Sequence, residues 1–198
     1  MKLYFTGFLL FLSTIFVAEA QKTYVSSIQS FQKAYVKTHE VVQKKDKKYF
    51  KFFEPDAGFK VAANFIRITD SIGFIMKTSG KTPKKYFRYG VASFKIRDSS
   101  FKLTIYQGAE LMQTTLYKNY LFVPFTDLTS GEESYGAGRY LDLEIDDIIN
   151  HQMVLDFNKA YNPYCAYSDE YNCPIPPREN YLTIAITAGE KNFAKKIH

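Results

Sequence analysis

The sequence predicts a mainly β protein, α+β by count of its elements: an antiparallel β-sandwich or partly open β-barrel with one N-terminal amphipathic helix. After Pro55, apolar residues recur with a period of two, most clearly over residues 59–65. Two further apolar runs, 92–96 and 101–105, flank turn residues near Asp98, which is typical of a β-hairpin. Many short strands separated by turn signals are typical of sandwiches and barrels.

The N-terminal helix is predicted over residues 27–45. Its apolar stripe has spacings of three, four and seven, and Ser26 or Ser27 precedes it as a candidate N-cap. We expect this stripe to pack on the sheet as core. The stripe consists of Ile28, Phe31, Tyr35 and Val42. Further strands are predicted at 73–78, 121–125, 140–145, 153–157 and 182–186.

The first twenty residues have the pattern of a secretory signal peptide. Lys2 precedes an almost wholly apolar stretch, and Ala18-Glu19-Ala20 matches the small-x-small pattern of signal peptidase sites. This predicts a signal peptide over residues 1–20 and a single β-rich domain over 21–198. The domain is then exported, and periplasmic or extracellular, with no transmembrane segment after cleavage. An uncleaved N-terminal anchor is the alternative, although the stretch is shorter than the about 20 residues of a membrane span.

The formal net charge is +6, and much of the Lys lies in two runs, residues 44–48 and 81–85. Export argues against a nucleic-acid partner. The two runs are consistent with weak attraction to anionic surfaces of the cell envelope. The simpler interpretation is a solvated helix end and a solvated loop.

Cys165 and Cys173 are the two cysteines, and an even pair in an oxidising compartment predicts an intramolecular disulfide. Free thiols and a metal site are the alternatives. Zinc sites use closer cysteine pairs plus two more ligands, so the sequence predicts no metal ion and no cofactor.

Two partial motifs fail on spacing. Residues 78–82 end like a phosphate-binding loop, but Ile75 stands where the loop needs its first glycine. Ser134 lies in G-x-x-S-x-G rather than the G-x-S-x-G of a nucleophile elbow. Neither nucleotide hydrolysis nor a serine hydrolase is predicted.

The candidate site lies in the polar, aromatic stretch from residue 122 to 190. A glycine-rich turn leads into Arg139, which can hold a carboxylate or phosphate, and Asp156 begins a run of polar and aromatic side chains. The alternative is a self-satisfied polar network that fastens a long loop to the sheet. The candidate ligand-binding residues are Arg139, Asp156, Asn158, Tyr161, Asn162, Tyr164, Arg178, Glu179 and Asn180.

Two of the predicted strands, 140–145 and 153–157, are separated by a brief connection, so they are expected to pair as antiparallel neighbours. That pairing would place Arg139 beside Asp156. It would also bring Asn158, Tyr161 and Asn162 to the same place.

Two segments then resemble a known family. LFVPFTDLTSGEESYGAGRYLDL and LDFNKAYNPYCAYSDEYNCPIPPRENYLTIAITAGEK are similar to the DUF1684 family, a bacterial and archaeal group of unknown function. The resemblance spans roughly residues 49–191. It implies no activity, cofactor or catalytic residue, but it does imply that the polar stretch is a family feature.

The first functional hypothesis is a binding domain for a small polar or anionic ligand. The second is a carboxylate-based hydrolase acting on an envelope or sugar-like substrate. The third is a structural or interaction protein of the cell envelope. Two carboxylates facing one cavity, one with a raised pKa, would favour the enzyme, and the third hypothesis predicts no cavity. The candidate carboxylates are Asp127, Glu132, Glu133, Asp142, Asp156 and Glu179.

Overall fold

The computed structural model describes residues 5–195, with the backbone alone for residues 5–18 and for Ala20. One α-helix, α1 (Phe5–Thr38), precedes a sheet of seven strands. The strands are β1 (Lys60–Arg67), β2 (Phe74–Met76), β3 (Lys84–Ile96), β4 (Ser99–Gly108), β5 (Tyr120–Phe125), β6 (Arg139–Glu144) and β7 (Gln152–Asp156). The described residues also form seven 3₁₀-helices, of which two precede β1 and three follow β7: η1 (Lys44–Tyr49), η2 (Ala57–Phe59), η3 (Leu111–Gln113), η4 (Ile145–Asp147), η5 (Phe157–Lys159), η6 (Tyr164–Ala166) and η7 (Arg178–Asn180).

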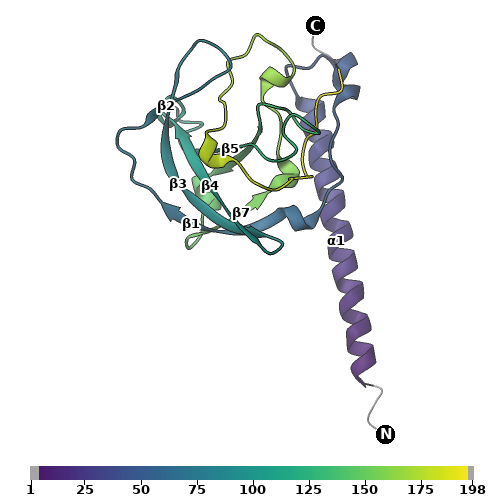
Figure 1. Ribbon diagram of the computed structural model, residues 1–198. Coiled ribbons are helices and arrows are strands. Elements are labelled where there is room, and N and C mark those ends of the chain that lie inside the picture. The colour runs from purple at the N-terminus through teal and green to yellow at the C-terminus, as the bar shows by residue number, and fades with distance from the viewer. Residues whose placement is uncertain (1–4, 196–198) are drawn as a thin grey trace.

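The strands form one antiparallel half-barrel sheet in the order β6-β5-β4-β3-β1-β7, with β2 added to β3 (Figure 1). The predicted fold class, mainly β with one N-terminal helix, is confirmed. The predicted hairpin is β3–β4, in which Ile96 pairs with Ser99 around a two-residue turn, and Arg97 takes a positive φ of 52° there. The long, twisted β3–β4 pair carries the curvature of the half-barrel.

Two topological predictions are wrong. β7 pairs with β1, not with β6, so the two strands expected to be neighbours form opposite ends of the sheet. The connection between them is short in sequence, but it spans the open side of the half-barrel. Residues 182–186 form no strand, because they make only isolated backbone bonds to the segment after β5. The N–H of Leu182 donates to the carbonyl of Thr126, and the N–H of Leu128 donates to the carbonyl of Ile184.

The sheet buries a different set of side chains on each face. On β5, Leu121, Val123 and Phe125 enter the main core, while Phe122 between them joins a second, aromatic cluster on the other face. This follows from the two-residue period of a strand. The second cluster also contains Met76, Tyr86, Tyr106 and Tyr140. It lies behind the surface where the candidate site is found.

Helix α1 lies against one side of the half-barrel (Figure 1). It differs from the predicted 27–45 helix at both ends. Ser26 and Ser27 lie inside it and donate to carbonyls one turn earlier instead of capping it. The helix ends at Thr38, where His39 Nδ1 accepts the backbone N–H of Val42 and turns the chain toward η1. Ile28 and Val42 are buried as predicted, whereas Phe31 is 38% exposed.

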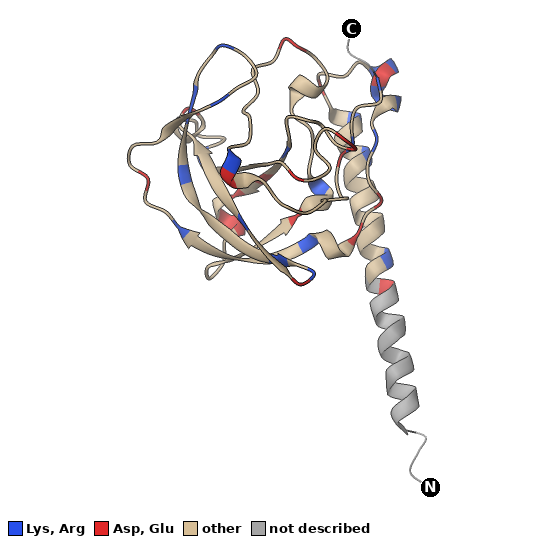
Figure 2. Cartoon of the chain, viewed as in Figure 1, with Lys and Arg blue, Asp and Glu red and all other residues tan. Residues whose placement is uncertain are grey.

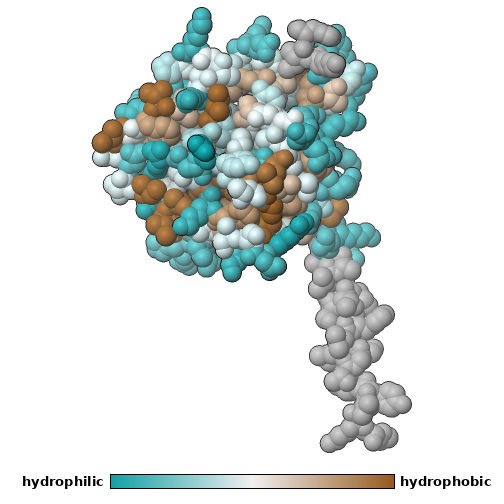
Figure 3. Space-filling model, viewed as in Figure 1, coloured by the Kyte–Doolittle hydropathy of each residue, from teal (hydrophilic) through white to brown (hydrophobic). Residues whose placement is uncertain are grey.

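The predicted n-region at Lys2 lies outside the described residues, and most of the predicted signal peptide is described by backbone alone. Among the described residues, no helix combines the length and the apolar character that a membrane span requires. The first Lys run forms η1, beside the end of α1 (Figure 2). Asp46 in this run pairs with Lys195 at 2.9 Å. On the face shown in Figure 3, apolar residues lie in separate patches among polar ones, which is common on protein surfaces.

Candidate binding cleft

A cleft of about 920 Å³ lies beside the aromatic face of the sheet; we call it the tyrosine cleft. One wall is formed by side chains of β3, β5 and β6, and the opposite wall by the loop from residue 161 to 174. Tyr35 near the C-terminal end of α1 and His39 just after the helix also line the cleft. Eight tyrosines line the cleft: Tyr35, Tyr86, Tyr117, Tyr120, Tyr140, Tyr161, Tyr164 and Tyr171. A lining so rich in phenol rings offers both aromatic surface and hydroxyl groups to a ligand.

Asp142 is the carboxylate held by the sheet wall. Its register partner across β5 and β6 is Phe122, so it shares a face with Tyr120 on the neighbouring strand. The hydroxyls of Tyr120 and Tyr161 both donate to Asp142 Oδ1, each at 2.6 Å. In the described part of the chain no donor reaches Oδ2. One carboxylate oxygen is therefore fixed by the protein, and the other is left for a partner in the cleft.

The environment of Asp142 is crowded although solvent reaches it through the open cleft. Burial among protein atoms raises the pKa of Asp142, and the hydrogen bonds from Tyr120 and Tyr161 partly oppose this. Burial, followed by the charge of Asp142, raises the pKa of Tyr120 well above its usual range. Burial, the neighbouring Tyr120 and Asp142 do the same for Tyr161. The two phenols are therefore neutral donors at physiological pH.

The rings around this carboxylate meet at steep angles. Tyr140 and Tyr161 have centroids 5.8 Å apart and planes at 89°, and Phe122 meets Tyr140 at 4.7 Å and 76°. Tyr164 and Tyr171 face each other across the loop wall at 5.1 Å and 69°. Edge-to-face contacts of this kind stabilise the aromatic lining.

A second hollow of about 850 Å³ lies between β6 and β7, on the open side of the half-barrel; we call it the edge groove. It shares Phe31, Asp142 and Tyr161 with the tyrosine cleft, so the two hollows meet at Asp142. Its acidic lining consists of Asp142, Asp146, Asp147 and Asp156, and its basic lining of Lys60 and Lys159. Within the described residues, no group of side chains could hold a metal ion.

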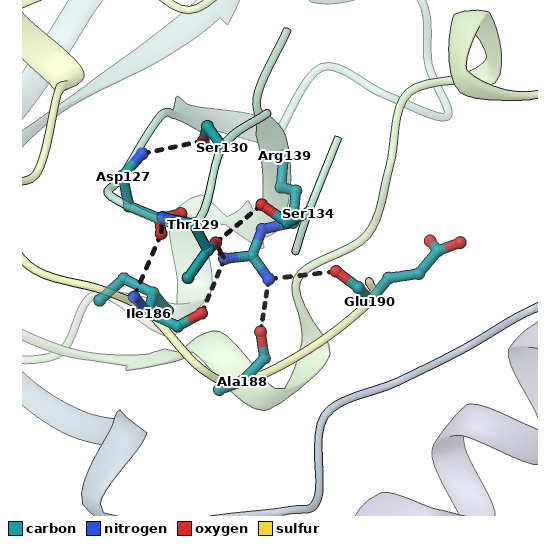
Figure 4. A network of polar contacts seen from close by, with 8 residues as sticks. All are labelled: Asp127, Thr129, Ser130, Ser134, Arg139, Ile186, Ala188 and Glu190. Atoms are coloured by element: carbon teal, nitrogen blue, oxygen red, sulfur yellow. Dashed lines mark hydrogen bonds and ion pairs between the residues drawn. The ribbon is translucent and has the colours of Figure 1, made fainter. Parts of the chain in front are cut away.

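Arg139 lies in neither hollow. Its side chain is fully buried and pairs with Asp127 at 2.9 Å. It also donates to the backbone carbonyls of Ile186, Ala188 and Glu190, and so fastens the C-terminal segment to β6 (Figure 4). Burial lowers the pKa of Arg139, and the charge of Asp127 opposes that shift.

The predicted contact between Arg139 and Asp156 is therefore wrong. It depended on pairing between β6 and β7, which the sheet order excludes. Instead Asp156 Oδ1 accepts the hydroxyl of Tyr24 at 2.8 Å and the backbone N–H of Asn158 at 3.1 Å. The expected convergence of five residues is not formed, although Asp156 and Tyr161 line the same groove.

The three asparagines of the predicted site are buried and bonded to the backbone. Asn158 exchanges hydrogen bonds with both backbone groups of Asp56. Asn180 bridges Thr104 and the carbonyl of Pro124. Asn162 donates its backbone N–H to Glu190 and its amide to Lys191. Their placement fits the alternative of a polar network that fastens the long loop to the sheet.

The remaining predicted residues lie on different surfaces. Tyr164 lines the tyrosine cleft and is 40% exposed. Arg178 is exposed at the start of η7. Glu179 accepts the hydroxyl of Tyr106 at 3.0 Å and pairs with Arg88 at 3.0 Å, outside both hollows.

The predicted disulfide between Cys165 and Cys173 is confirmed, with Cα atoms 6.2 Å apart. It closes the loop that carries Tyr164 and Tyr171, and so holds that wall of the tyrosine cleft. The hydroxyl of Ser79 donates to the carbonyl of Tyr171 and accepts the N–H of Cys173, which anchors the loop on the segment that follows β2.

Behind the cleft lies a buried acid, Glu190. Its carboxylate accepts the hydroxyl of Tyr167 at 2.7 Å, that of Tyr35 at 3.3 Å and the N–H of Asn162 at 2.9 Å. Burial raises the pKa of Glu190 to about 7, against the lowering effect of these hydrogen bonds. Burial lowers the pKa of nearby His39 to about 4, and its buried Nε2 has no partner among the described residues.

Sequence reasoning missed the residues at the centre of the cleft. Asp142 was included only among the candidate carboxylates, and neither Tyr120 nor Tyr140 was included as a site residue. The signal was present in the alternation of both strands. Between apolar residues at odd positions, β5 and β6 place Tyr120, Phe122, Tyr140 and Asp142 on one face.

A family model described as "Protein of unknown function (DUF1684)" matches residues 45–191. The chain belongs to this family. The DUF1684 match includes both walls of the tyrosine cleft, but α1 lies outside it. The chain is also similar to the solution NMR structure of an uncharacterised protein from Haloarcula marismortui, gene locus rrnAC0354. The two are 30% identical with a TM-score of 0.64, over 87% of this chain and 96% of that chain. A comparison with curated proteins found no match.

Proposed function

We propose that this DUF1684 protein is an exported domain that binds a small polar ligand in the tyrosine cleft, with Asp142 as the anchoring group. The observation that carries this proposal is the unequal use of the two oxygens of Asp142. Oδ1 accepts two tyrosine hydroxyls at 2.6 Å, while Oδ2 has no donor from the described residues and lies in a cleft of about 920 Å³. A concave, mostly aromatic site with a few fixed polar groups is typical of small-molecule binding.

Rigidity of the walls supports the same proposal. The sheet wall is part of the β5–β6 pair, and the loop wall is closed by the Cys165–Cys173 disulfide. A preformed site loses less conformational entropy when it binds a ligand. The hypothesis of a purely structural protein predicted no cavity, and the cleft disagrees with that expectation. The charged lining of the cleft offers no buried arginine for an anion, because Arg139 is used elsewhere.

The test is a screen of small polar compounds by thermal unfolding, together with native mass spectrometry of protein purified from its own host. A ligand present at 100 times its Kd should add about 2.7 kcal/mol of stability, or roughly 5–10 °C in Tm for a domain of this size. The Asp142→Asn variant should lose the shift. Glu132→Gln, which removes an exposed carboxylate outside both hollows, should keep it. Shifts of equal size in Asp142→Asn and wild type would reject the cleft as the site.

A carboxylate-based hydrolase is the second candidate, and one observation favours it. Asp142, whose pKa is raised by burial, and Asp156 line the same edge groove. Glycoside hydrolysis uses such a pair of carboxylates, one of which stays protonated as general acid. Hydrolysis of an aryl glycoside that is abolished by Asp142→Asn and by Asp156→Asn, with folding intact, would support it. Turnover retained in either variant would contradict it.

A further inference from the structure

The charges that line the tyrosine cleft oppose the charge of the whole molecule. Asp142, Glu40 and Glu170 face Lys84, so three carboxylates stand against one ammonium group, a formal charge of −2. The chain as a whole carries +6. His39 at the inner end adds no charge at neutral pH, because burial lowers its pKa to about 4. The described lining therefore favours a cationic guest over an anionic one.

The position of Asp142 makes this preference specific. Its Oδ1 is saturated by Tyr120 and Tyr161, which fixes the carboxylate in one orientation. Its Oδ2 accepts no hydrogen bond from the described residues, and solvent reaches it through the open cleft, so it is free to accept from a guest. An incoming cation would neutralise the charge of Asp142, whereas a neutral ligand would supply hydrogen bonds alone.

The aromatic lining supplies the kind of surface that such a cation contacts. The rings of Tyr140 and Tyr161 meet at 89°, and those of Phe122 and Tyr140 at 76°. Phe122 and Tyr140 are buried, so the rings that a guest can reach beside the carboxylate are those of Tyr120 and Tyr161, which are half-buried and line the cleft. Their hydroxyls both bond Asp142, so a group that contacts this carboxylate also lies near their rings. A cation within about 6 Å of a ring face gains about 0.5–2 kcal/mol, and ammonium ligands are recognised in this way.

We propose that the ligand of the tyrosine cleft is an organic cation, whose ammonium group lies against Asp142 and the rings of Tyr120 and Tyr161. This inference rests on the proposed binding function and adds the chemical class of the ligand.

The test compares three probes by isothermal titration calorimetry: choline, its neutral isostere 3,3-dimethylbutan-1-ol, and methyl β-glucoside. Choline and the alcohol have the same shape and differ in charge. We expect choline to bind at least about tenfold more tightly than the alcohol, which corresponds to about 1.4 kcal/mol. Asp142→Asn should remove most of that difference. Glu132→Gln, which changes the net charge equally outside the cleft, should leave it unchanged.

A second variant provides a test that does not depend on correct folding of Asp142→Asn. Tyr161→Leu removes one ring and one hydroxyl while keeping the carboxylate, and it should weaken choline binding by about twofold to thirtyfold. Equal binding of choline and the alcohol, binding of the glucoside alone, or no binding of any probe would overturn the cationic ligand. If the compound screen then yields a neutral ligand whose binding depends on Asp142, the proposed binding function stands without the cationic ligand. If the screen yields no ligand, both proposals are rejected.

Discussion

At the scale of single residues, the polar side chains form two separate groups: a buried network that holds the C-terminal segment, and the lining of the tyrosine cleft. Arg139 and Asp127 belong to the buried network. Gly138 immediately precedes Arg139 with φ +93°, and a Cβ there would meet the carbonyl of Phe125 at 2.5 Å. Only glycine lets the chain enter β6 so close to β5, and this places Arg139 beneath the C-terminal segment.

Replacement of Arg139 tests the fastening role. Arg139→Met should destabilise the protein by about 3–5 kcal/mol, because it leaves Asp127 buried without its counter-charge. The carbonyls of Ile186 and Ala188 also lose their donor. Urea unfolding monitored by circular dichroism measures the loss. The double variant Arg139→Met with Asp127→Asn should recover part of it, because no uncompensated charge remains. A loss of less than about 1 kcal/mol in the single variant would contradict the role.

Glu190 is expected to make stability depend on pH. Its pKa is raised to about 7 in the folded protein, from an ordinary value of 4.5. Below pH 4.5 the carboxyl is protonated in both states. Between pH 4.5 and 7 the unfolded chain ionises first, so stability falls as pH rises. The full loss is on the order of 3 kcal/mol. The groups that face the carboxyl are Tyr35, Tyr167, the N–H of Asn162 and the charge of Arg139.

The measurement is the unfolding free energy of wild type minus that of Glu190→Gln at several pH values. This difference should fall between pH 4.5 and 7.5, because the glutamine does not titrate. His39 acts in the opposite direction, since its lowered pKa makes stability fall as pH drops from 6.5 toward 4. His39 is present in both proteins, so its contribution cancels. A flat difference curve would show that Glu190 keeps an ordinary pKa.

At the scale of elements, the sequence predicted most of the strands and the β3–β4 hairpin, but it missed the partner of β7. The alternation that marks β1, β5, β6 and β7 is local, so it can be read along the chain. The partner of β7 is β1, roughly ninety residues earlier, and nothing in either strand specifies it. Residues 182–186 have the alternating pattern of a strand but do not form one. Their apolar side chains pack on the core. The backbone of Ile186 bonds to the side chains of Arg139 and Asp127 instead of to another strand.

The residues of the candidate cleft could be anticipated only in part, for the same reason. The stretch from residue 122 to 190 does supply the loop wall and Asp142. The other half of the cleft comes from Tyr86 on β3 and Tyr35 on α1, which only the folded sheet brings near. The sequence indicates that aromatic and carboxylate side chains would line a site. Which of them lie together depends on the order of the strands in the sheet, which the sequence did not reveal.

The disulfide is expected to stabilise both the fold and one wall of the cleft. Replacing Cys165 and Cys173 with serine should destabilise the protein by roughly 2.5 kcal/mol in the chain-entropy model, or about 5–10 °C in Tm. Because the loop positions Tyr164 and Tyr171, affinity for any ligand of the cleft should fall as well. Calorimetry with and without reductant measures the first effect. Wild type treated with reductant should match the double serine variant, and a reductant-insensitive Tm would contradict the prediction.

At the scale of the whole molecule, α1 forms part of the folded domain as well as the segment predicted to be processed. The described contacts of α1 with the barrel begin at Tyr24, whose hydroxyl donates to Asp156 and accepts from Asn158. Ile28 is 2% exposed, and Tyr35 reaches Glu190. These residues follow the predicted cleavage site, so cleavage after Ala20 would leave their contacts intact.

We therefore predict that the exported protein begins at Gln21 and is as stable as the full chain. The intact mass of material recovered outside the cytoplasm should correspond to residues 21–198, and a species that retains Met1 would contradict this.

The matched comparison is a chain that begins at Lys37. It loses Tyr24, Ile28 and Tyr35, and with them a buried side chain worth about 1.5–3 kcal/mol and the hydrogen bonds to Asp156 and Glu190. Its urea midpoint should fall well below that of the chain from Gln21. Equal midpoints would mean that α1 contributes nothing to the fold, and a lower midpoint for the chain from Gln21 than for the full chain would argue against processing at Ala20.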